Sequence, residues 1–261
     1  MEGALLVLLL LVVAAIGVAV YAASKASSRR TASALADAKA DARRVIERLG
    51  GQVFGLTGTD EASKQALADA SERYTAASSQ IEQADTVRQA ELAKESAVEG
   101  LYYIRAARTA MGMDPGPELE TLAGQRTAGA VTENRSVEFE GRQIAASPTP
   151  SPQTPNYYPG GRVAGRPVPA GWYSEPWWKP ALVAGAWGIG SALLFSSLFS
   201  GMAGVGYDTQ AFEQGYGEGF GDGFGQGELE GAGGWDGGDT GGWDGGDSGM
   251  FGDGGFGGFD F

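Results

Sequence analysis

Residues 3–24 form a run of 22 uncharged residues dominated by leucine, valine and alanine, and this run constrains the fold more than any other feature. As a helix with a rise of about 1.5 Å per residue it reaches roughly 33 Å, enough to cross a hydrocarbon core of about 30 Å. A second uncharged run, of 28 residues, covers 180–207. The sequence therefore predicts two transmembrane helices, at 1–24 and 180–207.

Each run has an alternative interpretation. The first could be a cleaved signal peptide, because Val20-Tyr21-Ala22 resembles a cleavage site. Signal peptides begin with basic residues, whereas Glu2 precedes this run, so an anchor is favoured. The second could be a buried helix of a soluble core. The rest of the chain offers too little apolar sequence to cover such a helix, which favours a membrane span.

Positive charge is confined to the segment between the two runs. All 19 lysines and arginines lie from Lys25 to Lys179; Lys25, Arg29 and Arg30 directly follow the first run, and Lys179 directly precedes the second. Basic residues are retained on the cytoplasmic side of membrane helices. We therefore expect a plasma-membrane protein with residues 25–179 in the cytoplasm and both termini outside.

A group of aromatic residues lies just before the second run and ends in a lysine. Tryptophan and tyrosine are enriched at the headgroup level of bilayers. The sequence therefore predicts a membrane-interface belt, with a small folded lid or a proline-rich turn as the alternative. Its members are Trp172, Tyr173, Trp177, Trp178 and Lys179.

Residues 25–113 have the apolar spacing of packed helices. Apolar positions alternate at intervals of three and four, which marks one face of a helix. The first helix is expected to end at Gly50-Gly51 and a second to begin near Thr59. The pattern then slips by one residue near 84–86, where Thr86 and Gln89 match a capping box, so a break is expected there. The positions on this seam are Leu35, Ala38, Ala42, Val45, Leu49, Leu67, Ala70, Tyr74, Ala77, Ile81, Ala84, Val87, Ala90, Lys94, Ala97, Leu101, Ile104 and Met111.

The seam is mostly alanine, so an isolated bundle would bury little apolar area per residue and would be marginally stable. Self-association into a homo-oligomer would supply more burial, as would packing on a protein partner or on the membrane-proximal region. A third interpretation is a helical spacer with a solvated charged face. Glu95 and Glu99, one turn apart, are expected on such a face.

The segments after the helices are more polar. Residues 114–146 show a short alternation at Val137, Phe139 and Ile144 around Glu140-Gly141, which predicts a small hairpin. Residues 147–179 are rich in proline and are expected to form an extended, mobile linker.

The last segment, 208–261, carries 12 acidic residues, no basic residue and much of the chain's glycine. Such a sequence cannot offset the ordering entropy of about 1–2 kcal/mol per residue, so the tail is predicted to be disordered. Its spaced aromatic residues favour weak multivalent protein contacts. A tandem octapeptide at 233–248 also offers oxygen ligands for weak Ca²⁺ binding, and a solvated extension without a partner is the plain alternative. The candidate ligands are Asp236, Asp239, Asp244 and Asp247.

Side-chain inventory limits the chemistry. The chain has neither histidine nor cysteine, which excludes cysteine nucleophiles, thiolate metal sites and histidine acid–base chemistry. It has no phosphate-binding glycine-lysine loop and no basic stripe for nucleic acid. The sequence predicts no enzyme activity, no catalytic residue and no cofactor.

The overall layout resembles a group of uncharacterised actinobacterial membrane proteins. The resemblance rests on the linker Tyr157-Tyr158-Pro159-Gly160-Gly161 and on the approach from Trp172 to Trp178 toward a second apolar segment, within about residues 157–200. An N-terminal anchor, an alanine-rich helical region and a glycine-rich tail complete it. It implies membrane placement and assigns no activity and no functional residue.

Together these features predict a mainly α protein: two transmembrane helices flank a cytoplasmic antiparallel helical hairpin or bundle, with a disordered linker and tail. The expected function is that of a non-enzymatic membrane scaffold that contacts lipid and protein partners, not nucleic acid. The alternatives are a passive anchor with a weak Ca²⁺-responsive external tail and an accessory subunit of a membrane enzyme.

Overall fold

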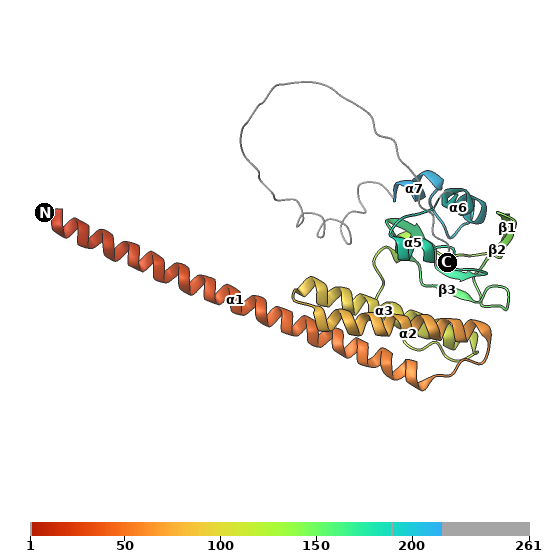
Figure 1. The fold of residues 1–261 in the computed structure, drawn as a ribbon, viewed down its shortest axis with the longest axis horizontal. Coiled ribbons are helices and arrows are strands. Elements are labelled where there is room, and N and C mark those ends of the chain that lie inside the picture. The colour runs from red at the N-terminus through yellow and green to blue at the C-terminus, as the bar shows by residue number, and fades with distance from the viewer. Residues whose placement is uncertain (1, 189, 216–261) are drawn as a thin grey trace, which may run out of the picture. The chain divides into compact units, whose positions relative to one another are not determined.

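The computed structural model describes residues 2–188 and 190–215, without the side chains of residues 2, 4–10, 12–16, 18–20, 22, 26 and 182. Its first part is a bundle of three helices, α1 (Glu2–Gly55), α2 (Glu61–Gln83) and α3 (Val87–Ala110) (Figure 1). Small antiparallel sheets and short helices follow. The predicted helical bundle is confirmed, and the β-structure is more extensive than predicted.

Within the part of the chain whose side chains are described, no helix is both long enough and apolar enough to span a membrane. The predicted first span, 1–24, falls largely on side chains outside that part.

The predicted seam forms the core of the bundle. Ala42 and Leu49 of α1, Ala70 of α2 and Ala97 of α3 are fully buried in one apolar cluster. The predicted helix end at Gly50-Gly51 is wrong, because α1 continues to Gly55. Gly50 serves close packing instead: a Cβ there would lie 2.8 Å from Cε2 of Tyr74 on α2.

Side-chain caps fix where α2 and α3 begin. Asp60 caps α2, one residue later than expected: its Oδ1 accepts from the Ser63 amide at 2.8 Å, and Ser63 Oγ accepts from the Asp60 amide at 3.1 Å. The predicted break at 84–86 and its capping box are confirmed. Thr86 Oγ1 accepts from the Gln89 amide at 3.2 Å, and Gln89 Oε1 accepts from the Thr86 amide at 3.1 Å.

The predicted hairpin is confirmed as β1 (Arg135–Phe139) and β2 (Arg142–Ser147). Its two loop residues, Glu140 and Gly141, have φ of 51° and 74°, as a type I′ turn requires. The hairpin belongs to a four-stranded sheet of order β1-β2-β6-β3, with β3 at Asn156–Tyr158 and β6 at Gly171–Tyr173.

The predicted extended linker at 147–179 is wrong, because most of it is folded. Besides β3 and β6 it contains the two-stranded sheet of β4 (Gly161–Val163) and β5 (Arg166–Val168). The short, buried, apolar β6 pairs with β2 on one side and β3 on the other, which draws the proline-containing segments between them into the fold. The short helix α4 (Gln125–Ala128) contacts β4 and β5.

The predicted second transmembrane helix, 180–207, is also wrong. The run divides into α5 (Lys179–Ala184) and α6 (Ser191–Phe199), with Gly185 at φ 67° and Gly190 at φ 93° between them. These left-handed glycines interrupt the helix. Leu194, Phe195, Leu198 and Phe199 of α6 are buried in protein, together with Phe212 of α7 (Thr209–Gln214), whereas Leu193 is exposed.

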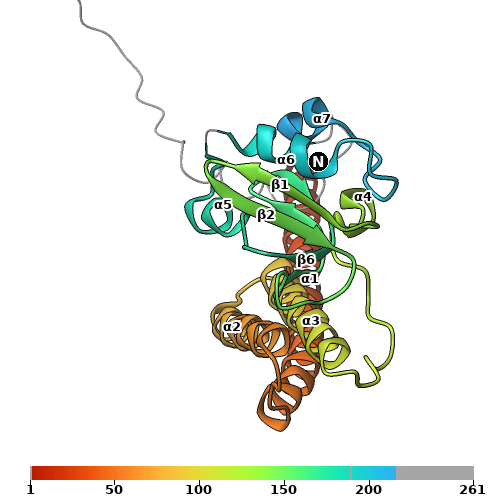
Figure 2. The ribbon, with the colours of Figure 1, turned by 90° about the vertical axis from the view of Figure 1, so that its right-hand side faces the viewer.

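The sheets separate two groups of helices. Figure 2 shows α2 and α3 on one side of the strands and α6 and α7 on the other. Phe195 of α6 stacks on Phe212 with ring centroids 4.2 Å apart, at the centre of the second apolar cluster. For 180–207 the structure therefore supports the alternative interpretation, in which the run contributes to a protein core.

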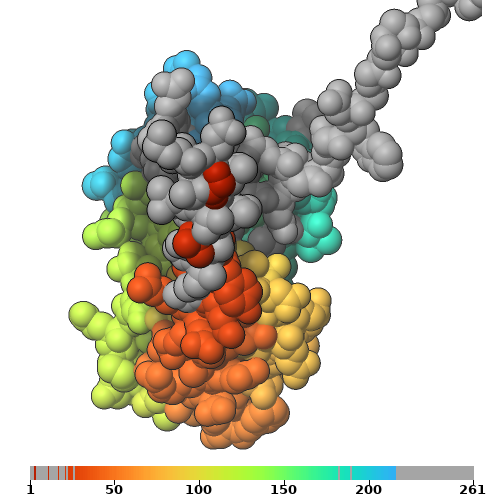
Figure 3. Space-filling view, turned by 90° about the vertical axis from the view of Figure 1, so that its left-hand side faces the viewer, coloured from red at the N-terminus to blue at the C-terminus, as the bar shows by residue number. Residues whose placement is uncertain are grey.

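The segment after α3 runs back along the bundle. Leu119 packs on the bundle core, and the Tyr102 hydroxyl donates to the Glu120 carbonyl at 3.2 Å. Lys94 Nζ binds both Glu120, at 3.1 Å, and Asp41 of α1, at 2.8 Å. Viewed from the N-terminal end of α1, this lime-coloured segment lies on one side of α1 and the yellow helices lie on the other (Figure 3).

Two glycines provide a matched test of the packing. A Cβ on Gly100 of α3 would lie 2.4 Å from Leu49 Cδ2 and 3.1 Å from Arg73 Cβ, whereas one on Gly51 would meet nothing within 4 Å. We expect Gly100→Ala to lower the free energy of unfolding by about 1–3 kcal/mol through overpacking. Gly51→Ala should raise it by about 0.5 kcal/mol through helix propensity. Urea unfolding followed by circular dichroism measures both, and equal effects would contradict the close α1–α3 packing.

Candidate functional site

A cavity of about 660 Å³ opens beside the β1–β2 hairpin. Most of its wall is apolar and aromatic, and one side carries charged groups. Such a combination of an apolar wall and a few convergent polar groups is typical of ligand and partner sites. The residues that line it are Phe139, Glu140, Arg142, Glu175, Pro176, Trp177, Lys179, Pro180, Ala181, Val183, Trp187, Gly188, Ser191 and Leu194.

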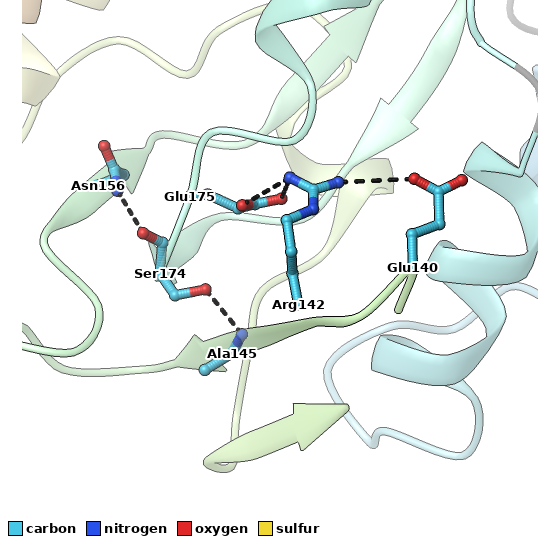
Figure 4. A network of polar contacts seen from close by, with 6 residues as sticks. All are labelled: Glu140, Arg142, Ala145, Asn156, Ser174 and Glu175. Atoms are coloured by element: carbon cyan, nitrogen blue, oxygen red, sulfur yellow. Dashed lines mark hydrogen bonds and ion pairs between the residues drawn. The ribbon is translucent and has the colours of Figure 1, made fainter. Parts of the chain in front are cut away.

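Arg142, the first residue of β2, organises the charged side of the cavity (Figure 4). Its Nη1 donates to both carboxylate oxygens of Glu175, at 2.8 and 2.9 Å, and its Nη2 lies 3.7 Å from Glu140 Oε2. Opposite charges at these distances hold one another in place. The three side chains therefore form a self-contained ionic network on the cavity wall.

The backbone before Glu175 is held by its own hydrogen bonds. Ser174 Oγ accepts from the Ala145 amide at 2.9 Å, and the Ser174 amide donates to the Ala145 carbonyl at 3.0 Å. Asn156 Nδ2 donates to the Ser174 carbonyl at 3.0 Å (Figure 4). These bonds extend the β2–β6 ladder by one residue and carry the Glu175 side chain toward Arg142.

The aromatic side of the cavity is formed by Trp177 and Trp187, whose ring centroids are 5.7 Å apart. Trp187 is fixed by a hydrogen bond from its Nε1 to the Val163 carbonyl, at 2.9 Å. Trp177 Nε1 is buried, and among the described residues it has no hydrogen-bond partner.

Lys179 links the cavity to the helical bundle. Its Nζ donates to Asp69 Oδ1 on α2 at 2.9 Å and lies 4.0 Å from Glu72 Oε2. The Asp69 side chain is 8% exposed, and Gln65 Nε2 also donates to it, at 3.3 Å. The cavity wall and α2 therefore share one largely buried ion pair.

A second ion pair lies where α2 and α3 meet the sheet. Arg73 Nε is 3.5 Å from Glu99 Oε1, and the two side chains are 22% and 23% exposed. Burial raises the pKa of the Glu99 carboxyl, and the nearby Arg73 opposes that rise. The expectation that Glu99 lies on a solvated face is wrong. Burial also raises the pKa of the Tyr157 hydroxyl, whose ring packs against Tyr103, to about 12.

The five residues predicted as a membrane-interface belt occupy the protein interior or its internal junction. Trp172 and Tyr173, on the central strand β6, are 3% and 0% exposed, and Trp178 is 2% exposed. Trp172 packs against alanines of α2 and α3, and the Tyr173 hydroxyl donates to the Pro169 carbonyl at 2.7 Å. Trp177 and Lys179 line the cavity. Three of these residues, Trp172, Tyr173 and Trp178, therefore belong to the protein core.

The four predicted Ca²⁺ ligands, Asp236, Asp239, Asp244 and Asp247, lie outside the described residues. Among the residues that are described, no group of three or more acidic side chains is placed to hold a metal ion.

The sequence did not predict the Lys179–Asp69 pair or the Arg142–Glu175 pair, because the two members of each pair are far apart in the chain. One sequence feature could have indicated the first pair. Asp69 lies between Ala66 and Ala70, both fully buried, and a charged residue at such a position needs a partner. Nothing in the sequence indicated that Arg142 would meet Glu175.

No protein-family model, no curated protein and no solved structure matches this chain. The arrangement is therefore interpreted from its own chemistry. The charged groups on the cavity wall are already paired with one another or with the bundle, and the rest of the wall is largely aromatic. Such a surface is suited to binding and positioning.

The Lys179–Asp69 pair is open to a direct test. Lys179→Gln should lower the free energy of unfolding by about 1–2 kcal/mol, because it leaves the Asp69 carboxylate buried without its cation. Arg44→Gln removes an arginine from the exposed pair with Asp41 and should cost under about 0.5 kcal/mol. Urea unfolding of both variants measures the difference. Adding Asp69→Asn to Lys179→Gln should restore part of the loss, and no coupling between the two would contradict the pair.

The raised pKa of Glu99 predicts a pH dependence. The folded state retains the Glu99 proton at pH values where the unfolded chain, with a pKa near 4.5, has released it. Stability from this group is therefore fully present below about 4.5 and is lost as the pH rises through the folded pKa. Glu99→Gln mimics the protonated carboxyl, so its unfolding free energy should be close to that of the native chain at low pH and should exceed it as the pH rises through the folded pKa of Glu99. Urea unfolding of both chains across pH measures the difference. A difference that does not vary with pH would contradict the burial of this carboxyl.

Proposed function

We propose that this chain is a non-enzymatic, single-pass membrane protein that holds a folded interaction domain at a membrane surface. The observation that carries the proposal is the continuity of α1, one helix from Glu2 to Gly55. Its N-terminal part is the uncharged run 3–24, and its C-terminal part contributes Ala42 and Leu49 to the bundle core. A membrane anchor at 3–24 would therefore be joined to the bundle without a flexible linker.

The folding of 180–207 into the protein core changes the expected topology. With one span in place of two, residues 25–261 would lie on a single side of the membrane. Lys25, Arg29 and Arg30 after the run, and Glu2 before it, support a cytoplasmic location for that side. In this proposal the acidic tail lies in the cytoplasm and not outside the cell.

The proposed partners are proteins. The cavity supports this role because its aromatic wall is open and its charges are mutually neutralised, which suits an apolar side chain of a partner better than a free ion. The glycine- and aromatic-rich tail adds candidate multivalent contacts. Homo-oligomerisation remains part of the proposal.

Cysteine labelling tests the topology cleanly, because the native chain has no cysteine. Ser71→Cys places a thiol at an exposed position of α2, and Ser248→Cys places one in the tail. In intact cells both should be protected from a membrane-impermeant maleimide, and both should react after permeabilisation. Carbonate extraction should leave the protein with the membrane.

Three outcomes would contradict this proposal in different ways. Labelling of Ser248→Cys alone would support two spans and an external tail. Labelling of both positions in intact cells would place the folded domain outside. Release of the chain by carbonate would exclude an anchor.

A further inference from the structure

Three basic side chains form a collar on α1 immediately after the uncharged run: Lys25, Arg29 and Arg30, hereafter the basic collar. All three are exposed. Tyr21, Lys25 and Arg29 follow one another at intervals of four and so share one face of the helix. Lys25 Nζ lies 5.9 Å from the Tyr21 ring centroid, and Tyr21 is 67% exposed.

The basic collar has no acidic partner among the described residues. The next acidic residue along α1 is Asp37, about 10 Å beyond Arg30 at 1.5 Å per residue. Farther along the same helix, Arg44 is paired with Asp41 at 3.4 Å. The positive charge of the collar is thus left for a group outside the chain.

The collar also has no role in the bundle. From residue 27 to residue 34 every side chain is exposed, and packing against the bundle begins at Leu35. An exposed tyrosine followed by lysine and arginine on one face is typical of a helix that leaves a bilayer through its headgroup layer. The partner that complements this charge at this place is an anionic lipid surface.

We infer that the basic collar binds the anionic headgroups of the membrane in which α1 is anchored, and so fixes the depth and lipid surroundings of the helix. This inference rests on the proposed membrane anchor. Each exposed basic residue near such a surface contributes about a fivefold local enrichment of anionic lipid at most. The enrichment decreases when salt shortens the screening length from about 8 Å to about 3 Å.

The test uses the full chain with Ser28→Cys, which carries a fluorescent donor within the collar, reconstituted in vesicles of phosphatidylcholine and phosphatidylglycerol. Energy transfer is compared between a trace of headgroup-labelled phosphatidylglycerol and a trace of headgroup-labelled phosphatidylcholine. We expect severalfold stronger transfer to phosphatidylglycerol, and a ratio that returns toward one at molar salt. Lys25→Gln with Arg29→Gln and Arg30→Gln should abolish the preference.

A matched variant separates the collar from net charge. Arg43→Gln with Arg44→Gln and Arg48→Gln removes the same charge from exposed positions of α1. These begin about 20 Å beyond Arg30, more than two screening lengths away, so this variant should keep the lipid preference.

The outcomes distinguish the anchor from the collar. Vesicle flotation at high pH reports the anchor, and a chain that fails to float contradicts the proposed function itself. A chain that floats but transfers equally to both lipids, or a collar variant that keeps the preference, overturns the inference. Binding of a DNA duplex through the same three residues, without lipid preference, would overturn it as well.

Discussion

The close approach of alanine-lined helices is the constraint on which the rest of the structure depends. Ala42, Ala70 and Ala97 are fully buried between α1, α2 and α3, and Gly100 brings the Leu49 side chain against the α3 backbone. Small side chains allow close packing but bury little area, so such a bundle needs further cover. The chain supplies that cover itself: Trp172 of the central strand packs on alanines of α2 and α3, and Leu119 returns along the bundle. The sheets and the segment after α3 thus cover apolar surface of the bundle.

This dependence explains why local features could be predicted and long-range ones could not. The seam, the break at 84–86, the Thr86–Gln89 box and the Glu140-Gly141 hairpin all follow from residues a few positions apart. The high density of apolar residues in 180–207 predicts a membrane helix, but segments buried in a protein core have the same density. The glycines of this run are the better indication of a broken helix. Gly185 and Gly190 adopt positive φ and separate α5 from α6. The cavity could not be predicted, because Arg142 and Glu175 meet only through the β2–β6 pairing.

The Lys179–Asp69 pair ties the cavity wall to the bundle, whereas the Arg73–Glu99 pair joins α2 to α3 within the bundle. Lys179, at the start of α5, binds Asp69 of α2, so the cavity wall and the bundle are in direct contact through this pair. The Arg73–Glu99 pair holds charge in a largely buried place, where pairing offsets desolvation only in part. The Lys179–Asp69 pair favours one position of the cavity wall on the helices. Through Lys179, the wall of the candidate site is continuous with the helix bundle that α1 joins.

The exposed part of α1 between the uncharged run and the bundle is its least supported segment. It is rich in serine and threonine, and Thr31 Oγ1 and Ser24 Oγ donate to the carbonyls of Ser27 and Tyr21, at 3.2 and 2.9 Å. Such bonds compete with helical ones, and like charges one turn apart, as at Lys25 and Arg29, add repulsion. Anionic headgroups around the basic collar would reduce that repulsion in a segment where serine and threonine lower the helix propensity. In the inferred arrangement, the charge that would recruit the lipid is also the charge that weakens the helix without it, which would couple lipid binding to the continuity of α1.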